Sequence, residues 1–224
     1  MEVVSDFDGT IVNIDVVEYL LAQYANGDWR RYDELYERGE ISLEECLRLQ
    51  YGMIREPKQK LLGAVDDVAY FRTGLDDLLA FSEKEGNSFT IVSAGLDFVI
   101  GHMLNRKNIQ RRIAVLAPKS RPTSRGILLD FSHLPQGDSS NFKTNVVRSF
   151  RARGRRVAYI GDGLSDFEAI KEANVKFVIK GSRLAERCVR EYVPCQEIVS
   201  LEEVSSHLAG ARTRDHWGVE AKST

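Results

Sequence analysis

Four short apolar runs, each followed by small or acidic residues, constrain the fold of this chain more than any other feature. They span residues 3–4, 89–92, 157–160 and 177–179, and most of their members are β-branched or aromatic. Apolar runs of this kind are typical of parallel strands that are buried on both faces of a sheet. The chain therefore contains the strands of a buried parallel sheet.

Segments with helical spacing of apolar residues lie between these runs. The segment 75–81 precedes Gly86, and the segment 146–150 precedes Gly154. Glycine commonly ends a helix because it adopts the left-handed conformation without strain. Strands that alternate with helices predict an α/β fold built on a doubly wound parallel sheet.

One long interval interrupts this alternation directly after the first strand. It carries four consecutive helical patterns, at 16–24, 29–37, 43–54 and 58–68, and Ser42 with Glu45 forms a candidate capping box for the third. An insertion there would lie above the carboxyl ends of the strands, where ligands of such sheets bind, and could act as a lid. We expect a core domain of residues 1–12 and 73–209, a helical cap at 13–72 and a disordered tail at 210–224.

The interval 109–141 has a different character, because proline and glycine recur through it. A short apolar run at 127–131 is the one candidate strand. We expect an irregular segment with a single β-ribbon, and we assign no role to its His133.

Composition excludes several classes of partner. The net charge is −2, from 31 basic and 33 acidic residues mixed along the chain, so no overall field would attract nucleic acid. The N-terminus shows neither a signal peptide nor a membrane span. Three cysteines without ligand spacing indicate reduced thiols, so we expect a cytoplasmic protein whose oligomeric state the sequence does not determine.

Two carboxylates follow the first apolar run closely. Asp6 and Asp8 stand on the same side of an extended turn, with Gly9 to bend the chain and the hydroxyl of Thr10 beyond. The two acids repel each other, so the arrangement indicates that a divalent cation lies between them or that one acid holds a proton. A solvated loop would be the default reading for this motif alone.

Three further pieces follow later strands or open helices. Ser93 ends the second run, Lys143 stands at a predicted helix start, and the loop 161–166 adds the carboxylates of Asp162 and Asp166. Each is weak by itself, since a serine turn, a lysine or an acidic loop is usually only solvated surface. Strand ends converge in such a fold, so their joint occurrence predicts a site for phosphate and a hard cation.

Taken together, these motifs resemble the four signatures of the haloacid dehalogenase superfamily of aspartate-nucleophile phosphatases, over most of the chain. The helical insertion matches the small cap that one branch carries after the first signature. The resemblance implies that Asp6 is the nucleophile and that Asp8 protonates the leaving alcohol and then activates water. It also implies that Thr10, Ser93 and Lys143 hold the phosphoryl oxygens.

The same resemblance implies a magnesium ion. Its ligands would be Asp6, the backbone carbonyl of Asp8, and Asp162, with Asp166 as a further ligand or as a partner of one. The carboxylate at Asp8 favours phosphoryl transfer over dehalogenation. We therefore expect a Mg²⁺-dependent phosphatase that acts on a small phosphorylated metabolite through an aspartyl phosphate.

Within the superfamily, the chain looks most like phosphoserine phosphatases and their methionine-salvage relative that acts on 2-hydroxy-3-keto-5-methylthiopentenyl-1-phosphate. Asp15 falls where phosphoserine phosphatases carry a substrate-binding glutamate. Gln50 takes the place of their carboxylate-binding arginine, so serine recognition would lose its charged anchor. Ala94 replaces a glycine beside Ser93. We expect Asp15 and Gln50 to contact substrate, and the residues before Lys143 favour the salvage relative.

Two other functions remain open at this stage. A phosphotransferase or mutase would use the same Asp6 chemistry and pass the phosphoryl group to another hydroxyl. A noncatalytic phosphate-binding module is the alternative from a different class, and the intact set of acids and Lys143 speaks against it.

Overall fold

The structure is a computed structural model that describes residues 1–217, with side chains described for residues 1–210. Its main sheet consists of β1 (Glu2–Ser5), β2 (Ser88–Val92), β3 (Ala114–Leu116), β6 (Val157–Gly161), β7 (Val175–Ile179) and β8 (Gln196–Ile198). All neighbours are parallel, in the order β3–β2–β1–β6–β7–β8. The winding direction therefore reverses between β1 and β6, where such sheets bind ligands. The predicted doubly wound α/β fold is confirmed.

The central strands form where the sequence is continuously apolar. Val3, Val4 and Ile160 are completely buried because helices cover both faces of the sheet. The two edge strands β3 and β8 are not predicted from the sequence. Exposed residues such as Ala114 and Glu197 interrupt their hydrophobic pattern, because an edge strand is only partly covered.

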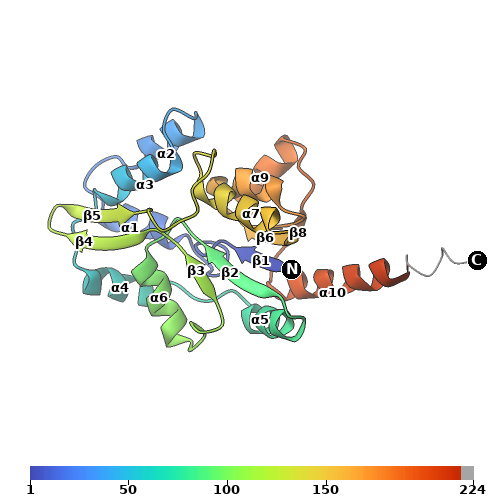
Figure 1. Cartoon of the computed structure of the whole chain (residues 1–224). Helices are drawn as coiled ribbons and strands as arrows, with labels where there is room; N and C mark the ends of the chain where they lie inside the picture. The colour runs from blue at the N-terminus through green and yellow to red at the C-terminus, as the bar shows by residue number, and fades with distance from the viewer. Residues whose placement is uncertain (218–224) are drawn as a thin grey trace, which may run out of the picture.

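Helices lie on both sides of this sheet. They are α5 (Leu75–Lys84), α6 (Asp97–Arg106), α7 (Phe142–Ala152), the short α8 (Phe167–Glu172) and α9 (Arg183–Arg190). Figure 1 shows α5 and α6 on one side, with α7 and α9 on the other. No helix within residues 1–217 is both long enough and apolar enough to cross a bilayer.

Four helices follow β1 in sequence, and we call them the cap helices: α1 (Val16–Tyr24), α2 (Arg30–Glu37), α3 (Leu43–Tyr51) and α4 (Lys58–Asp66). They lie beyond the carboxyl ends of the strands (Figure 1). The four predicted helices are confirmed, although α3 ends three residues earlier than expected because Gly52 caps it. The hydroxyl of Ser42 accepts a hydrogen bond from the Glu45 amide, which is one of the two bonds of the predicted capping box.

The segment between α6 and α7 contains an antiparallel hairpin, β4 (Lys119–Thr123) and β5 (Gly126–Asp130). This hairpin is the predicted β-ribbon, and it packs against α3 of the cap. Gly126 has φ 134°, and a Cβ there would lie 2.2 Å from the carbonyl oxygen of Gly52. Arg48 also donates to the carbonyl of Leu129. Backbone contact between hairpin and helix therefore requires glycine at position 126.

The last helix, α10 (Glu202–Trp217), extends away from the sheet (Figure 1) and packs on α5. It corrects the prediction of disorder for 210–217, while residues 218–224 of that predicted tail lie outside the described residues. Val204 and Leu208 are buried and anchor the first turns. Once a helix is nucleated, each added residue contributes a hydrogen bond, so polar residues can continue it.

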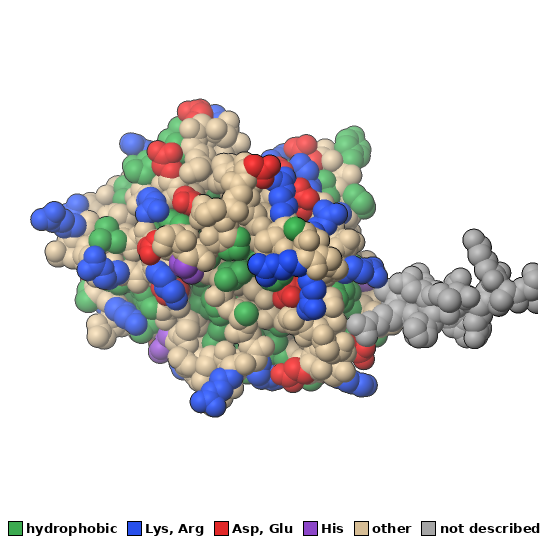
Figure 2. All heavy atoms as spheres, in the orientation of Figure 1, with side chains coloured by type: hydrophobic (Ala, Val, Ile, Leu, Met, Phe, Trp, Pro, Cys, Tyr) green, Lys and Arg blue, Asp and Glu red, His purple; other side chains and the backbone are tan. Residues whose placement is uncertain are grey.

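The described surface carries charges of both signs. Figure 2 shows basic and acidic side chains interspersed on the visible face. Cys46, Cys188 and Cys195 are all free thiols. Neither observation requires a charged macromolecular partner or a disulfide framework.

Candidate active site

The loop after β1 places two carboxylates at the carboxyl end of the central strand. Asp6 is only 6% exposed, and one of its oxygens accepts the Phe7 amide at 2.7 Å. Gly9 has φ 68°, and a Cβ there would lie 2.1 Å from an oxygen of Asp162. Only glycine therefore lets this loop approach the loop after β6. Thr10 joins the two loops, since its hydroxyl donates to Asp162 at 2.6 Å.

Asp166 lies behind the loop after β6 and is completely buried. Its Oδ1 accepts from Lys143 Nζ at 2.7 Å and from the Tyr159 hydroxyl at 2.7 Å. Its Oδ2 accepts from the amides of Asp162 at 3.2 Å and Gly163 at 3.0 Å. A carboxylate offers about four acceptor positions, and all four are taken. Asp166 thus fixes the loop and the lysine in place.

Lys143 lies in the first turn of α7 and points its ammonium group into the acidic cluster. The side chain is 1% exposed, and Nζ lies 2.9 Å from Asp6 Oδ2 as well as contacting Asp166. Asn141 is the N-cap of α7 and accepts from the Lys143 amide at 2.9 Å. Its amide nitrogen donates to the Ser165 carbonyl at 2.6 Å and to the Tyr36 hydroxyl of the cap at 3.1 Å. One side chain therefore joins the lysine helix, the acidic loop and α2.

Ser93 follows β2 and is completely buried. Its hydroxyl accepts from the Gly95 amide at 2.9 Å and lies 3.4 Å from Asp8 Oδ2. A Cβ at Gly95 would come within 2.3 Å of the same Asp8 oxygen. The loop after β2 thus packs its backbone directly against Asp8.

Burial and like charges perturb the ionisation of this cluster. Burial and then the charge of Asp166 raise the pKa of Asp6 well above its ordinary value. Burial and then Asp15 raise the pKa of Asp8 to about 8, and burial with Asp166 raises the pKa of Asp162 to about 7. Burial lowers the pKa of Lys143, but Asp166 and Asp6 raise it more, so the lysine stays charged. The acids outnumber the one cation among them.

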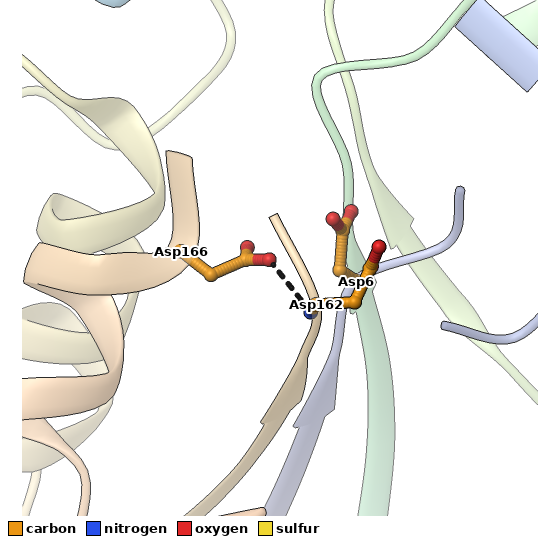
Figure 3. A group of neighbouring side chains, drawn as sticks. All are labelled: Asp6, Asp162 and Asp166. Atoms are coloured by element: carbon orange, nitrogen blue, oxygen red, sulfur yellow. Dashed lines mark hydrogen bonds between the residues drawn. The ribbon is translucent and has the colours of Figure 1, made fainter. Parts of the chain in front are cut away.

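Three of these carboxylates could surround a metal ion. Oxygens of Asp6, Asp162 and Asp166 lie within 4.8 Å of one another. In Figure 3, Asp6 and Asp162 extend in the same direction from the ends of adjacent strands, whereas Asp166 approaches from the side and bonds the Asp162 amide. Hard oxygen donors of this kind suit Mg²⁺.

A cavity of about 690 Å³ separates the strand ends from the cap helices. Asp6, Asp8, Lys143 and Asp162 line its floor, whereas Thr10 and Ser93 lie beneath that floor. Of the three candidate phosphate-binding residues, only Lys143 lines the cavity. The hydroxyl groups of Thr10 and Ser93 are instead hydrogen-bonded to other groups of the protein.

Both predicted cap residues also line the cavity. Asp15 caps α1 by accepting from the Glu18 amide at 2.8 Å. Gln50 is 3% exposed, and its amide nitrogen donates to Asp33 Oδ1 at 2.8 Å and to the Trp29 carbonyl at 3.3 Å. The sequence analysis does not single out Asp33.

Other side chains of the site also lack a sequence signal. The Tyr51 hydroxyl donates from the cap to the Ala94 carbonyl at 2.9 Å, and Asn141 and Tyr159 make the contacts given above. Of these, only Asn141 could have been identified from the sequence, as a possible N-cap of the helix that carries Lys143. His133 contacts the Ala117 carbonyl at 3.0 Å and does not line this cavity.

The parallel sheet reverses its winding between β1 and β6, and carboxylates from these two strand ends lie with a buried lysine below the cap helices. This arrangement is typical of an enzyme site at the switch point of a doubly wound α/β sheet. The family model of haloacid dehalogenase-like hydrolases matches residues 3–171, and the chain belongs to this family. The superfamily resemblance noted from the sequence is thereby confirmed.

Curated relatives have one recurrent name, 2-hydroxy-3-keto-5-methylthiopentenyl-1-phosphate phosphatase. The protein from Exiguobacterium sibiricum is 28% identical over 185 residues, covering 78% of this chain and 81% of the relative. The protein from Geobacillus thermodenitrificans is 26% identical over 210 residues, covering 91% and 93%.

Among solved structures, a phospho-aspartyl intermediate analogue of phosphoserine phosphatase aligns with a TM-score of 0.69 at 18% identity, covering 92% of this chain and 97% of that one. A substrate-bound phosphoserine phosphatase aligns with a TM-score of 0.69 at 17% identity, covering 92% and 97%. At these identities the likeness establishes the shared fold.

Proposed function

We propose that this protein is a Mg²⁺-dependent phosphatase that hydrolyses a small phosphorylated metabolite through a phosphorylated Asp6. The observation that carries the proposal is the position of Asp6. Its buried carboxylate lies on the cavity floor, at the end of the central strand, 2.9 Å from Lys143 Nζ. The names of the curated relatives support phosphate ester hydrolysis as the reaction.

The residues at the strand ends fit a magnesium ion. Asp6 and Asp162 offer carboxylate oxygens, and no donor within the described residues reaches the backbone carbonyl of Asp8. We propose these three groups as ligands and Asp166 as the residue that positions Asp162 and Lys143, because its acceptor positions are filled. When bound, Mg²⁺ would neutralise charge on the phosphoryl oxygens.

Within this arrangement the side chains have separate tasks. An oxygen of Asp6 attacks phosphorus, the bond to the leaving oxygen breaks, and Asp8 gives its proton to the departing alkoxide. The Asp8 carboxylate then takes a proton from water, whose oxygen attacks phosphorus and releases Asp6 and phosphate. Lys143 offsets negative charge at Asp6 throughout, and Thr10 holds Asp162 in place.

The cap defines the reacting volume. We propose that residues 13–72 form a cap domain over a core domain of residues 1–12 and 73–209, since the four helices lie beyond the strand ends. A closed cap would exclude bulk water from the aspartyl phosphate except for the attacking molecule. The 690 Å³ cavity has room for a small metabolite and none for a folded macromolecule.

Phosphate release tests the proposal. Purified protein is incubated with a panel of phosphorylated metabolites, including phosphoserine and the methylthiopentenyl phosphate, with Mg²⁺ or with a chelator. We expect Mg²⁺-dependent release that falls by more than about 10⁴-fold in kcat in Asp6→Asn, because the nucleophile is lost. Asp77→Asn, an exposed acid on α5, is the matched control and should retain activity.

Product analysis separates hydrolysis from transfer. Inorganic phosphate formed in step with free alcohol supports a phosphatase, whereas a new phosphate ester formed with an added alcohol would indicate a phosphotransferase. Equal release by wild type and Asp6→Asn would contradict the proposed nucleophile.

A further inference from the structure

The roof of the cavity contains a pair of polar side chains that the proposed chemistry does not use. Asp33 on α2 and Gln50 on α3 both line the cavity, and Gln50 is almost fully buried. The Gln50 amide nitrogen donates to Asp33 Oδ1 at 2.8 Å and to the Trp29 carbonyl at 3.3 Å. The pair therefore has a fixed geometry within the cap.

The donor and acceptor directions of this pair are determined by its chemistry. An ionised carboxylate can only accept, so the nitrogen of Gln50 must face Asp33 and its oxygen must face elsewhere. No donor from the described residues reaches Oε1 of Gln50 or Oδ2 of Asp33, and Oδ1 has only a distant thiol, Cys46 Sγ at 3.9 Å, as a second neighbour. The pair thus offers acceptors to the cavity and has no donor of its own to spare.

The charges around the cavity reinforce this preference. Eight acidic and three basic side chains line it, and each basic one has an acidic partner. Arg183 pairs with Glu37, Arg30 lies 3.8 Å from Glu18, and Lys143 is held by Asp6. The charge of Arg183 also acts on Asp33, but around the cavity as a whole the acidic side chains outnumber the basic ones. A second anionic group at the roof would therefore meet net repulsion.

We infer that Asp33, oriented by Gln50, binds a hydrogen-bond donor on the leaving alcohol, a hydroxyl or an ammonium group, and that the roof rejects a carboxylate at this position. The inference rests on the proposed phosphatase function and narrows its substrate class. Phosphoserine carries both kinds of group, so its ammonium would suit Asp33 whereas its carboxylate would be disfavoured at this position. The inference favours alcohols that carry a neutral or positively charged polar group.

A purely structural role for the pair is the alternative. Gln50 would then serve only to join α3 to α2 through its hydrogen bond to Asp33 Oδ1, and Asp33 Oδ2 would face water. The two readings differ in one observable quantity, which is selectivity for the end group of the substrate. A structural contact would change stability or all substrates alike.

A series of alkyl phosphates tests the inference. The chains have two to five carbons, and each ends in methyl, hydroxyl, ammonium or carboxylate. At the chain length that reaches the roof, we expect hydroxyl or ammonium to give a kcat/KM at least about tenfold above methyl and carboxylate, because a buried acceptor left unpaired is costly. The wild-type protein alone can overturn the inference. It does so if kcat/KM is highest for the carboxylate series, or if hydroxyl and ammonium show no advantage over methyl at any chain length.

Asp33→Asn keeps an oxygen for Gln50 and presents a donor to the cavity. We expect its preference for hydroxyl or ammonium over methyl to shrink to less than about threefold and its relative activity on the carboxylate series to rise. A larger loss for ammonium than for hydroxyl would identify a cation as the favoured group. The exposed Asp28→Asn, on the same cap segment, is the matched control. An unchanged preference in Asp33→Asn would contradict the assignment.

A binding measurement separates this inference from the proposed reaction. Alkyl phosphonates with the same four end groups are titrated into wild-type protein with Mg²⁺ by calorimetry. If no phosphate ester is hydrolysed while the phosphonates keep the predicted order of Kd, the phosphatase proposal fails and the donor-binding roof stands. If phosphate is released and the carboxylate-ended phosphonate binds best, the phosphatase proposal stands and the donor-binding roof fails.

Discussion

The floor and the roof of the cavity use acidic side chains in opposite ways. Beneath the floor, Asp166 has all of its acceptor positions filled by protein donors, and Lys143 bridges it to Asp6 on the floor. On the roof, Asp33 shares a single oxygen with Gln50. The floor is a closed network that holds its side chains in one geometry, whereas Asp33 Oδ2 and Gln50 Oε1 on the roof receive no donor from the described residues. Under the proposed function, reaction type and substrate choice would reside in different layers of the molecule.

Removal of Lys143 should break the floor most severely. Lys143→Met leaves Asp6 and Asp166 buried without their shared cation, so we expect the free energy of unfolding to fall by about 3–5 kcal/mol and kcat/KM by more than about 10³-fold. Urea denaturation and phosphate release measure the two quantities. Lys60→Met, on an exposed ion pair of the cap, is the control and should change neither appreciably. A stability loss below about 1 kcal/mol would mean that the floor is not a coupled network.

A smaller change should loosen the contact between the two layers. Tyr36→Phe removes the hydroxyl that accepts from Asn141 at 3.1 Å, and Asn141 also caps the helix of Lys143. We expect kcat/KM to fall about 2- to 10-fold, mainly through KM, with a stability change below about 1.5 kcal/mol. Steady-state kinetics and thermal melting check this. Tyr70→Phe, whose hydroxyl is exposed on the surface, should leave both unchanged, and an equal loss there would contradict the assignment.

The weakest expected effect lies where the cap meets α6, outside the cavity. Asp66 on α4 contacts His102 at 2.8 Å and also Arg106. Slight burial raises the pKa of Asp66, but hydrogen bonds and charge from His102 and Arg106 lower it overall. A carboxyl with a depressed folded-state pKa stabilises the fold above its unfolded pKa of about 3.9 and loses that contribution as pH falls through the folded value.

Asp66→Asn should therefore lower the free energy of unfolding by about 0.2–1 kcal/mol at pH 7. The difference from wild type should shrink as the pH falls below about 4. Denaturation curves at several pH values measure it, with the neighbouring Asp67→Asn as control. A difference that grows toward low pH would have the wrong sign for this pair.

The central strands were predictable because a strand that is buried on both faces of the sheet consists of consecutive apolar residues, which can be recognised in the sequence. The strand at 157–160 is predicted for that reason, and the edge strand β8 is missed because Gln196 and Glu197 are exposed. The cap helices follow from the spacing of their apolar residues. The helical part of α10 beyond Ala209 is missed because its residues are polar, although an established helix can extend through them.

The site divides in the same way. Asp6 and Asp162 could be assigned because they follow strands whose ends must converge. The pairing of Asp33 with Gln50, and of Asn141 with Tyr36, joins residues 17 and 105 positions apart, on elements whose packing no local pattern encodes. Residue positions at the floor thus follow from topology, whereas contacts in the roof require the three-dimensional arrangement.

The glycine contact between the hairpin and α3 has a consequence for how such an enzyme can diversify. Gly126 meets the backbone of Gly52, so main-chain packing, together with the buried side chains of α3, supports the helix that carries Gln50. A side chain that faces the cavity, such as Gln50, can then be exchanged while this backbone contact stays in place. Under the proposed function, single substitutions there would exchange one substrate for another while the ester bond keeps its distance from Asp6.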